Sequence, residues 1–296
     1  MNAAVLLSIA VAATFAAEPV PSASAYSRSI AEWRNAREAP LKADDGWLTV
    51  VGLFWLDPGA NVAGASNAAA IVLPPGSAPA RTATFTLAGD QVQFRAEPGV
   101  RFTLGGRPVT ETTLRPDTGG NPDVLTLGTM RLILLKRGER YAIRVKDNAS
   151  PARRRFAGLR WYPADPTWRI TARFTPYPAP RKIAIQNVTG ATEQMESPGF
   201  VEFTREGKTY RLEPIAEGSQ LFFVFRDATS GKTTYGAGRF LYADAPKGET
   251  VLLDFNKSEN PPCAFTPYAT CPLPPRQNRL ALPVTAGEMK YPGTDH

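Results

Sequence analysis

The sequence predicts a mainly β fold, with two β-sandwich or barrel-like domains preceded by one amphipathic helix. From Trp47 onward, short apolar runs rich in Val, Ile, Phe, Tyr and Thr alternate with Gly, Pro, Asn and Asp. Runs of strand length that are separated by turn residues are typical of sandwiches and barrels. Residues 27–43 carry the one convincing helical pattern, and no second helix of comparable length is expected.

The predicted helix is amphipathic. Its inward-facing positions recur at steps of three or four residues, at Ile30, Trp33, Arg37 and Leu41. Charged residues lie between them, as in a helix that covers a core with one face. Pro40 and the run at 44–46, Asp-Asp-Gly, indicate where the helix ends. We expect its apolar stripe to pack on the body that follows.

The predicted strands are short and bounded by turn residues. They are Leu48–Leu56, Ile71–Leu73, Ala83–Leu87, Val92–Arg95, Met130–Leu135, Tyr141–Val145, Arg169–Phe174, Ile183–Val188, Phe200–Thr204, Tyr210–Leu212, Leu221–Phe225 and Val251–Phe255. The segment 200–212 is predicted to be a hairpin, because Gly207 lies in the four-residue connection 205–208 between Phe200–Thr204 and Thr209–Leu212.

A domain boundary is expected near residues 147–160, where the strand pattern stops and a basic run, Arg153–Arg155, follows. The predicted organisation is a signal peptide at 1–25, a helix at 26–46, a first β-sandwich at 47–148 and a second β domain at 149–296. Both β segments are long enough to form a core of their own.

Residues 1–25 have the features of a secretory signal peptide. A short apolar stretch at 3–17 is followed by small residues that end in Ala23-Ser24-Ala25, a pattern that signal peptidase cleaves. A second cleavage site is possible at 14–16, and a buried or interfacial helix is the alternative. No other apolar run approaches the length of a transmembrane helix. We therefore expect a periplasmic or secreted protein with no transmembrane segment.

The composition excludes several classes of chemistry. The chain has one histidine, His296, which is its last residue. Because imidazole is the usual general base, Ser-His-Asp and Cys-His catalysis are not expected, nor are zinc sites that depend on histidine. We predict no metal site and no cofactor.

The net charge of +7 is compatible with acidic partners, although a solvated basic surface is the better explanation of it. Export and the absence of a recognition-helix or RNA-binding motif indicate that nucleic acid is not a partner.

The second half resembles the domain of unknown function 1684 family. The phrases that carry the resemblance are Arg144–Asp147, Phe156–Pro163, Thr233–Leu241, Asp254–Asn256, Asn260–Phe265, Cys271–Pro275 with Asn278, and Ala286–Glu288. The resemblance implies a shared fold and no particular activity.

The first half, from Gly52 to about Val145, resembles a forkhead-associated β-sandwich. The segments that carry this resemblance are Pro58–Gly64, Ile71–Pro74 and Gly105–Val109. Members that bind phosphothreonine have an Arg after the Gly of the first loop and a Ser-x-x-His in the next. This chain has Ala65 and the run Ser-Ala-Pro-Ala-Arg at 77–81 instead. The resemblance therefore implies the fold, and no phosphopeptide binding is expected.

The two cysteines of the chain, Cys263 and Cys271, are eight positions apart. In an exported protein this spacing predicts a disulfide. Closing so short a loop contributes about 2.5 kcal/mol, and four nearby prolines already restrict the loop, so the bridge would mainly fix local shape. The alternatives are a redox pair, whose cysteines normally have two residues between them, and a metal site, which two thiolates cannot complete.

The candidate binding residues lie mostly around the cysteine loop. They are Arg239, Asp254, Asn256, Asn260 and Arg155. Asp254 and Asn256 share one face of a predicted strand end, where they either form a binding rim or cap the backbone of the loop.

Three functions remain open from the sequence. The first is binding of a polar or anionic small molecule or glycan in the cell envelope. The second is a hydrolase that uses carboxylates, with Asp227, Asp254 or Glu288 as acid or base and Tyr235 assisting. The third is a structural or assembly module in which the same residues fix loops. Whether the chain is an enzyme is left open.

Overall fold

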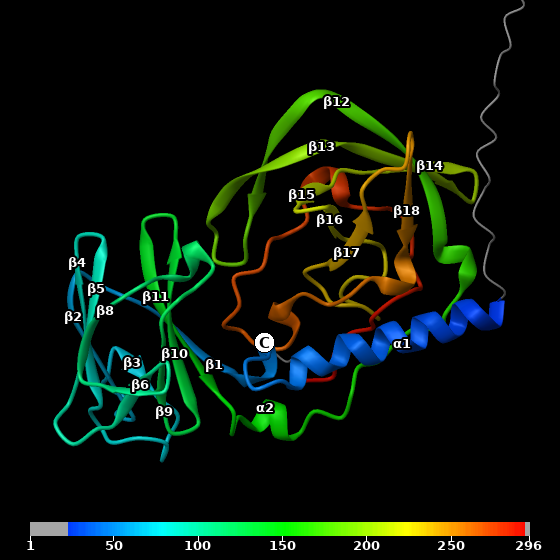
Figure 1. Cartoon of the computed structure of the whole chain (residues 1–296). Helices are drawn as coiled ribbons and strands as arrows, with labels where there is room; N and C mark the ends of the chain where they lie inside the picture. The colour runs from blue at the N-terminus through cyan, green and yellow to red at the C-terminus, as the bar shows by residue number, and fades with distance from the viewer. Residues whose placement is uncertain (1–22, 294–296) are drawn as a thin grey trace, which may run out of the picture.

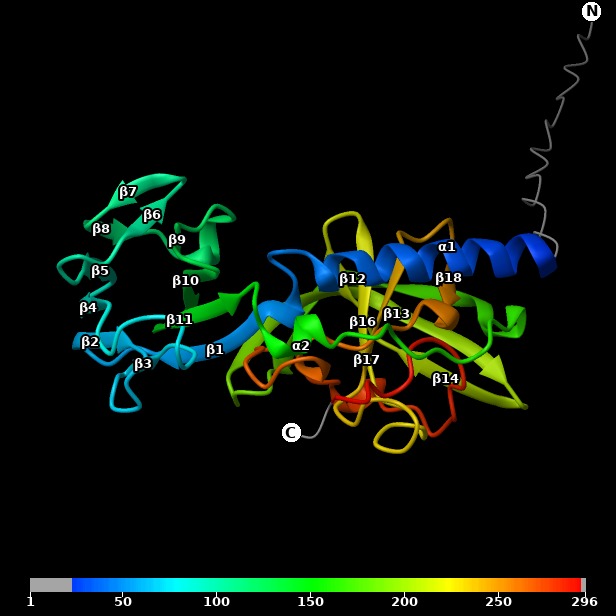
Figure 2. The same ribbon diagram turned by 90° about the horizontal axis from the view of Figure 1, so that it is seen from below.

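The computed structural model describes residues 23–293, and it confirms a mainly β fold with one long helix. The strands of residues 50–147 form one body and those of residues 169–254 form another, along which helix α1 (Ala23–Lys42) lies (Figures 1 and 2). Most of the predicted signal peptide, and His296, lie outside the described residues.

Helix α1 buries the predicted face. Ile30 and Leu41 are each 1% exposed, Tyr26 is buried one turn earlier, and Trp33 and Arg37 are partly buried. The helix ends at Lys42, two residues after Pro40. Among residues 23–293, no helix combines the length and apolar character needed to cross a bilayer.

The first body is built from two sheets. One has the order β1-β11-β10-β9-β6-β7 and the other the order β3-β2-β4-β5-β8. The strands are β1 (Val50–Trp55), β2 (Gly59–Gly64), β3 (Ile71–Val72), β4 (Ala83–Ala88), β5 (Gln91–Ala96), β6 (Phe102–Leu104), β7 (Arg107–Val109), β8 (Glu111–Leu114), β9 (Val124–Leu127), β10 (Met130–Arg137) and β11 (Arg140–Asp147). Phe85, Phe94 and Phe102 are buried in one core, with ring centroids 5.5 and 4.9 Å apart along the series.

A short helix, α2 (Pro151–Arg154), leads into the second body. Ser150 caps it, since its hydroxyl accepts a hydrogen bond from the Arg153 amide at 3.2 Å. The same hydroxyl donates to the carbonyl of Leu48 at 2.5 Å. This link therefore ties the start of the first body to the segment that follows it.

The second body contains a four-stranded sheet of order β14-β13-β12-β18 and a three-stranded sheet of order β15-β16-β17. The strands are β12 (Arg169–Gln186), β13 (Thr192–Arg205), β14 (Lys208–Leu212), β15 (Ile215–Glu217), β16 (Gln220–Phe225), β17 (Arg239–Asp244) and β18 (Thr250–Asp254). Residues from both sheets, including Phe203, Phe225 and Leu253, form one buried core together with Phe255, which follows β18.

Strand β12 differs from the prediction. The segments Arg169–Phe174 and Ile183–Val188 were expected as separate strands, but β12 runs from Arg169 to Gln186 and pairs with β13 on both sides of a register shift between Pro176 and Arg181. Proline cannot donate to a ladder, but it keeps an extended backbone and is compatible with an irregularity of this kind.

The predicted hairpin is confirmed as β13 and β14, with Thr204 opposite Thr209 and Arg205 opposite Lys208. Its turn residues, Glu206 (φ 51°) and Gly207 (φ 73°), both have left-handed values, as a type I′ turn requires.

Candidate functional site

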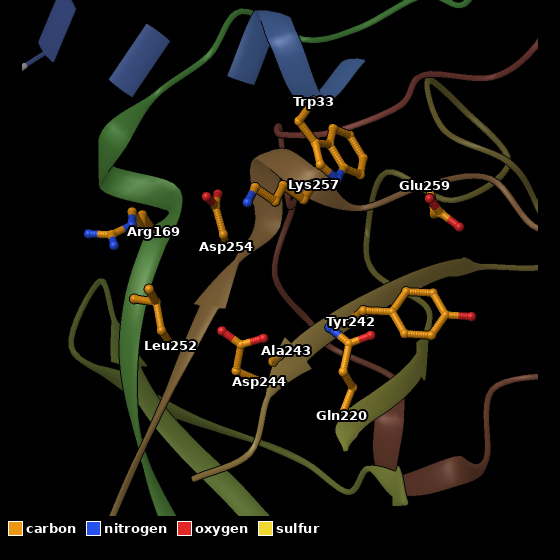
Figure 3. Close-up of a pocket in the computed structure, with 10 residues that line it drawn as sticks. All are labelled: Trp33, Arg169, Gln220, Tyr242, Ala243, Asp244, Leu252, Asp254, Lys257 and Glu259. Atoms are coloured by element: carbon orange, nitrogen blue, oxygen red, sulfur yellow. The ribbon is translucent and has the colours of Figure 1, made fainter. Parts of the chain in front are cut away.

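A cleft of about 490 Å³ lies between α1 and the ends of β17 and β18 (Figure 3). Its lining combines aromatic, acidic, basic and amide side chains. The residues are Trp33, Arg169, Gln220, Tyr242, Ala243, Asp244, Leu252, Asp254, Lys257 and Glu259.

The alternation of the strands explains how these side chains reach the cleft. In β17, Leu241 and Ala243 are buried in the core, so Tyr242 and Asp244 point to the opposite face. In β18, Leu253 is buried while Leu252 and Asp254 take the outer positions by the same rule. Two neighbouring strands therefore deliver polar and aromatic groups to one surface.

Asp254 is held firmly at the wall of the cleft. Its Oδ1 accepts hydrogen bonds from the Tyr26 hydroxyl at 2.8 Å and from the Asn256 amide and Nδ2, both at 3.2 Å. Asn256 Nδ2 also donates to the Tyr26 hydroxyl at 2.8 Å and to the Asp165 carbonyl at 2.8 Å. Burial, together with the bond to Asp254, raises the pKa of Tyr26, so this hydroxyl remains a donor. Among residues 23–293, the three hydrogen bonds described for Asp254 all end on Oδ1.

The charges around the cleft are mixed. Asp244, Asp254 and Glu259 contribute three carboxylates, and Arg169 and Lys257 contribute two cations. Figure 3 shows the Lys257 side chain extending towards the Asp254 carboxylate. Since Glu259 is paired with Arg37, the charges of the other lining residues balance.

Glu259 belongs to a second network that fastens α1 to the body. Arg37 Nε lies 2.9 Å from Glu259 Oε2 and 3.1 Å from Glu288 Oε1, while Arg37 Nη2 donates to the Asn260 carbonyl at 3.0 Å. The Asn260 amide donates to Glu288 Oε2 at 2.8 Å. Glu288 is fully buried, and this burial raises its pKa to about 7 in spite of Arg37. Burial also raises the pKa of Glu259.

Arg239 is enclosed in the interior, 0% exposed, and does not line the cleft. It donates to Asp227 Oδ2 at 2.9 Å, to the Val284 carbonyl at 2.9 Å and to the carbonyls of Ala286 and Glu288. Burial lowers the pKa of its guanidinium, and Asp227 opposes this shift. This arrangement braces the C-terminal segment against β17.

The predicted binding residues thus fall in separate places. Asp254 lines the cleft and is 9% exposed, whereas Asn256 and Asn260 lie outside the lining, are at most 1% exposed, and hold Asp254 and Glu288. Arg155 lines another cavity, of about 380 Å³.

The carboxylates that were predicted for a hydrolase are also separated. Asp254 lines the cleft, but Asp227 is buried against Arg239, and Glu288 against Arg37. Tyr235 lies elsewhere, where its hydroxyl donates to the Cys263 carbonyl at 2.9 Å.

The structure does not join Cys263 and Cys271 in a disulfide. The two residues are nevertheless adjacent, because the Cys263 amide donates to Cys271 Sγ at 3.1 Å. The disulfide that the sequence predicts therefore stays a prediction.

Most cleft residues were not predicted as site residues. Trp33 was interpreted only as part of the packing face of the helix, and Tyr242, Asp244 and Glu259 received no role. The usable signal was the alternation Leu-Tyr-Ala-Asp at 241–244, which places a tyrosine and an aspartate on one face of a strand end.

Comparisons with known proteins give a family and no activity. The model of the family described as "Protein of unknown function (DUF1684)" matches residues 154–289. No curated protein matches the chain.

Similar solved structures include an uncharacterized protein of Haloarcula marismortui, at 30% identity over 49% of this chain and 83% of that one, with a TM-score of 0.41. They also include the FhaA FHA domain complexed with the intracellular domain of Rv3910, at 20% identity over 32% of this chain and 97% of that one, with a TM-score of 0.23. A structure from work on phosphothreonine-dependent FHA domain interactions is similar at 21% identity over 33% of this chain and 96% of that one, with a TM-score of 0.23.

Proposed function

The chain belongs, through residues 154–289, to the family described as "Protein of unknown function (DUF1684)", and we propose that this member binds a hydroxyl-rich small molecule, such as a sugar unit of a glycan, in the cleft beside α1. The observation that carries the proposal is the pairing of aromatic faces with fixed carboxylates in one cavity.

The aromatic part of the cleft suits a sugar ring. Trp33 is partly exposed and Tyr242 is 37% exposed. Tyr242 is held in place by stacking on Phe222, with ring centroids 4.8 Å apart and an interplanar angle of 18°. Aromatic side chains offer an apolar face with a polar edge, which matches the apolar face and hydroxyl rim of a sugar.

The polar part of the cleft suits hydroxyl groups. An ionised carboxylate has several acceptor positions and forms stronger hydrogen bonds than a neutral acceptor. Asp254 is pre-oriented by Tyr26 and Asn256, so a ligand that binds to it loses little further side-chain freedom. Because Glu259 is paired with Arg37, the other lining carboxylates and cations balance, and a neutral sugar fits better than a charged one.

A series of sugars with one ring and different charge tests this proposal. Glucose should bind more tightly than glucosamine or glucuronic acid, measured by saturation-transfer NMR and calorimetry. Asp254→Asn should weaken binding by about tenfold to a hundredfold, as expected for the loss of one charge-assisted hydrogen bond of about 1.5–3 kcal/mol. The asparagine can still accept from Tyr26, so the wall of the cleft should persist.

The matched control is Glu193→Gln, which neutralises an exposed carboxylate on β13 outside the cleft and should leave binding unchanged. Equal binding by the Asp254→Asn and Glu193→Gln variants would refute the assignment of the site. Failure of all three sugars to bind would refute the ligand class.

We also propose that the protein is exported and that cleavage after Ala25 leaves Tyr26 as the first residue. The small-x-small run at 23–25 supports this site, and the mature chain would keep the tyrosine that holds Asp254. Intact mass measurement of the protein from the periplasm of a Gram-negative host should give a chain that begins at Tyr26. Ala25→Phe should block this cut. Uncleaved cytoplasmic protein, or a mature chain that begins at residue 17, would contradict the proposal.

A further inference from the structure

The two cysteines lie together in an apolar part of the second body, away from the sugar cleft. Both are 4% exposed and pack with Ile185, Phe222 and Phe240. The Cys263 amide donates to Cys271 Sγ at 3.1 Å. The two cysteines are therefore neighbours in the reduced protein.

The two cysteines differ in their access to solvent. A cavity of about 360 Å³ opens between β1 and the cysteine loop, and Cys263 lines it together with Trp55, Thr189, Tyr235 and Tyr268. Cys271 is not part of this lining. A small solute that enters the cavity therefore reaches Cys263 and not Cys271.

The two cysteines also differ in the pKa of their thiols, and this difference again favours Cys263 as the reactive one. The hydrogen bond from the Cys271 thiol lowers the pKa of Cys263, with a further contribution from Tyr235 and against the effect of burial. The same thiol–thiol bond, followed by burial, raises the pKa of Cys271. Because the thiolate is the nucleophilic form, reactivity and access coincide on Cys263.

We propose that Cys263 is an oxidation site that reduces a small hydroperoxide, with Cys271 as the resolving thiol. This assignment is independent of the sugar cleft, and it gives the cysteine pair a changing redox state in place of a permanent bridge.

The chemistry balances in two steps. The Cys263 thiolate attacks the outer oxygen of the hydroperoxide, the O–O bond breaks, and the leaving alkoxide takes up a proton to become an alcohol, which leaves Cys263 as a sulfenic acid. The Cys271 thiol then attacks the Cys263 sulfur, the S–S bond forms, the S–O bond breaks, and water leaves with the proton of Cys271. Two electrons pass from the thiols to the peroxide, and an external dithiol returns the disulfide to the reduced pair by exchange.

Hydrogen peroxide is a suitable probe for the full-length protein after reduction by dithiothreitol and removal of the reductant. The wild type should lose both thiols without forming a dimedone adduct, because Cys271 resolves the sulfenic acid. Cys271→Ser retains a hydroxyl donor but cannot resolve, so it should gain one dimedone adduct on Cys263. In Cys263→Ser the remaining thiol, Cys271, should react with peroxide at least about tenfold more slowly, as expected for a thiol that is largely protonated.

Two results would overturn the proposal. One is equal peroxide reactivity of the two single variants, which would remove the distinction between the thiols. The other is a disulfide in the native protein that dithiothreitol does not open, which would make the pair a permanent structural bridge.

If the variants fail to fold, peptide mapping of the reduced wild type after brief treatment with iodoacetamide tests which of the two thiols reacts first. Cys263 should be alkylated first, and preferential alkylation of Cys271 would refute the assignment.

Discussion

Replacing Arg239 with methionine is expected to destabilise the protein by about 3–5 kcal/mol, because the change leaves Asp227 as an uncompensated charge in the interior. Arg239 is 0% exposed and lies 2.9 Å from Asp227 Oδ2. It also donates to three main-chain carbonyls of residues 284–288, which would lose their partner. Urea unfolding at neutral pH measures the loss of free energy directly.

The double variant Arg239→Met, Asp227→Asn separates the two parts of this effect. Asp227 Oδ1 accepts from the amide and hydroxyl of Thr229 and from the Val284 amide, and an asparagine can keep those bonds. Neutralising the aspartate should therefore recover part of the stability that the single change removes. Arg154→Met, at an exposed position, is the matched control and should cost under about 0.5 kcal/mol. If the single Arg239 variant loses less than about 1 kcal/mol of unfolding free energy, the Arg239–Asp227 pair does not stabilise the fold as proposed.

The fold class could be predicted because local signals and tertiary structure agree. The amphipathic face of α1 and the glycine turn between β13 and β14 each depend on a few residues that are close in sequence, and both are found in the structure. Strand β12 was divided wrongly because prolines 176, 178 and 180 are turn signals in isolation. Pairing with β13 on both sides of the irregularity holds this segment extended, and no local pattern contains that information.

The site was predicted much less well, for a physical reason. The sequence places Asp254, Asn256 and Arg239 in one family resemblance, but it does not show which of them face solvent. Arg239 is enclosed by the C-terminal segment, whose position depends on the packing of the whole second body. The cleft also needs Trp33 from α1 opposite β17, a pairing of segments about two hundred residues apart that the spacing along the chain cannot reveal.

The stability of the protein is expected to depend on pH through Glu288, which belongs to the second network that holds α1 on the body. Burial raises the pKa of Glu288 to about 7 from an ordinary value of 4.5. Between these values the folded protein binds a proton that the unfolded chain has released, so the free energy of unfolding falls as the pH rises through this window. The stabilisation is complete below about pH 4.5 and lost above about pH 7, and it amounts to roughly 3 kcal/mol across the window.

Glu288→Gln tests this sign, because it removes the titration. Its amide cannot accept from both Arg37 and the Asn260 amide, so the variant should be less stable than the wild type at pH 5. The difference between the two proteins should shrink by about 2.4 kcal/mol between pH 5 and pH 7.5, since the wild type alone bears the cost of ionising a buried carboxyl. Glu196→Gln on the exposed face of β13 should differ from the wild type by a constant amount over this range. A constant difference for Glu288→Gln as well would mean that Arg37, although it is shared with Glu259, already keeps the Glu288 carboxylate ionised throughout.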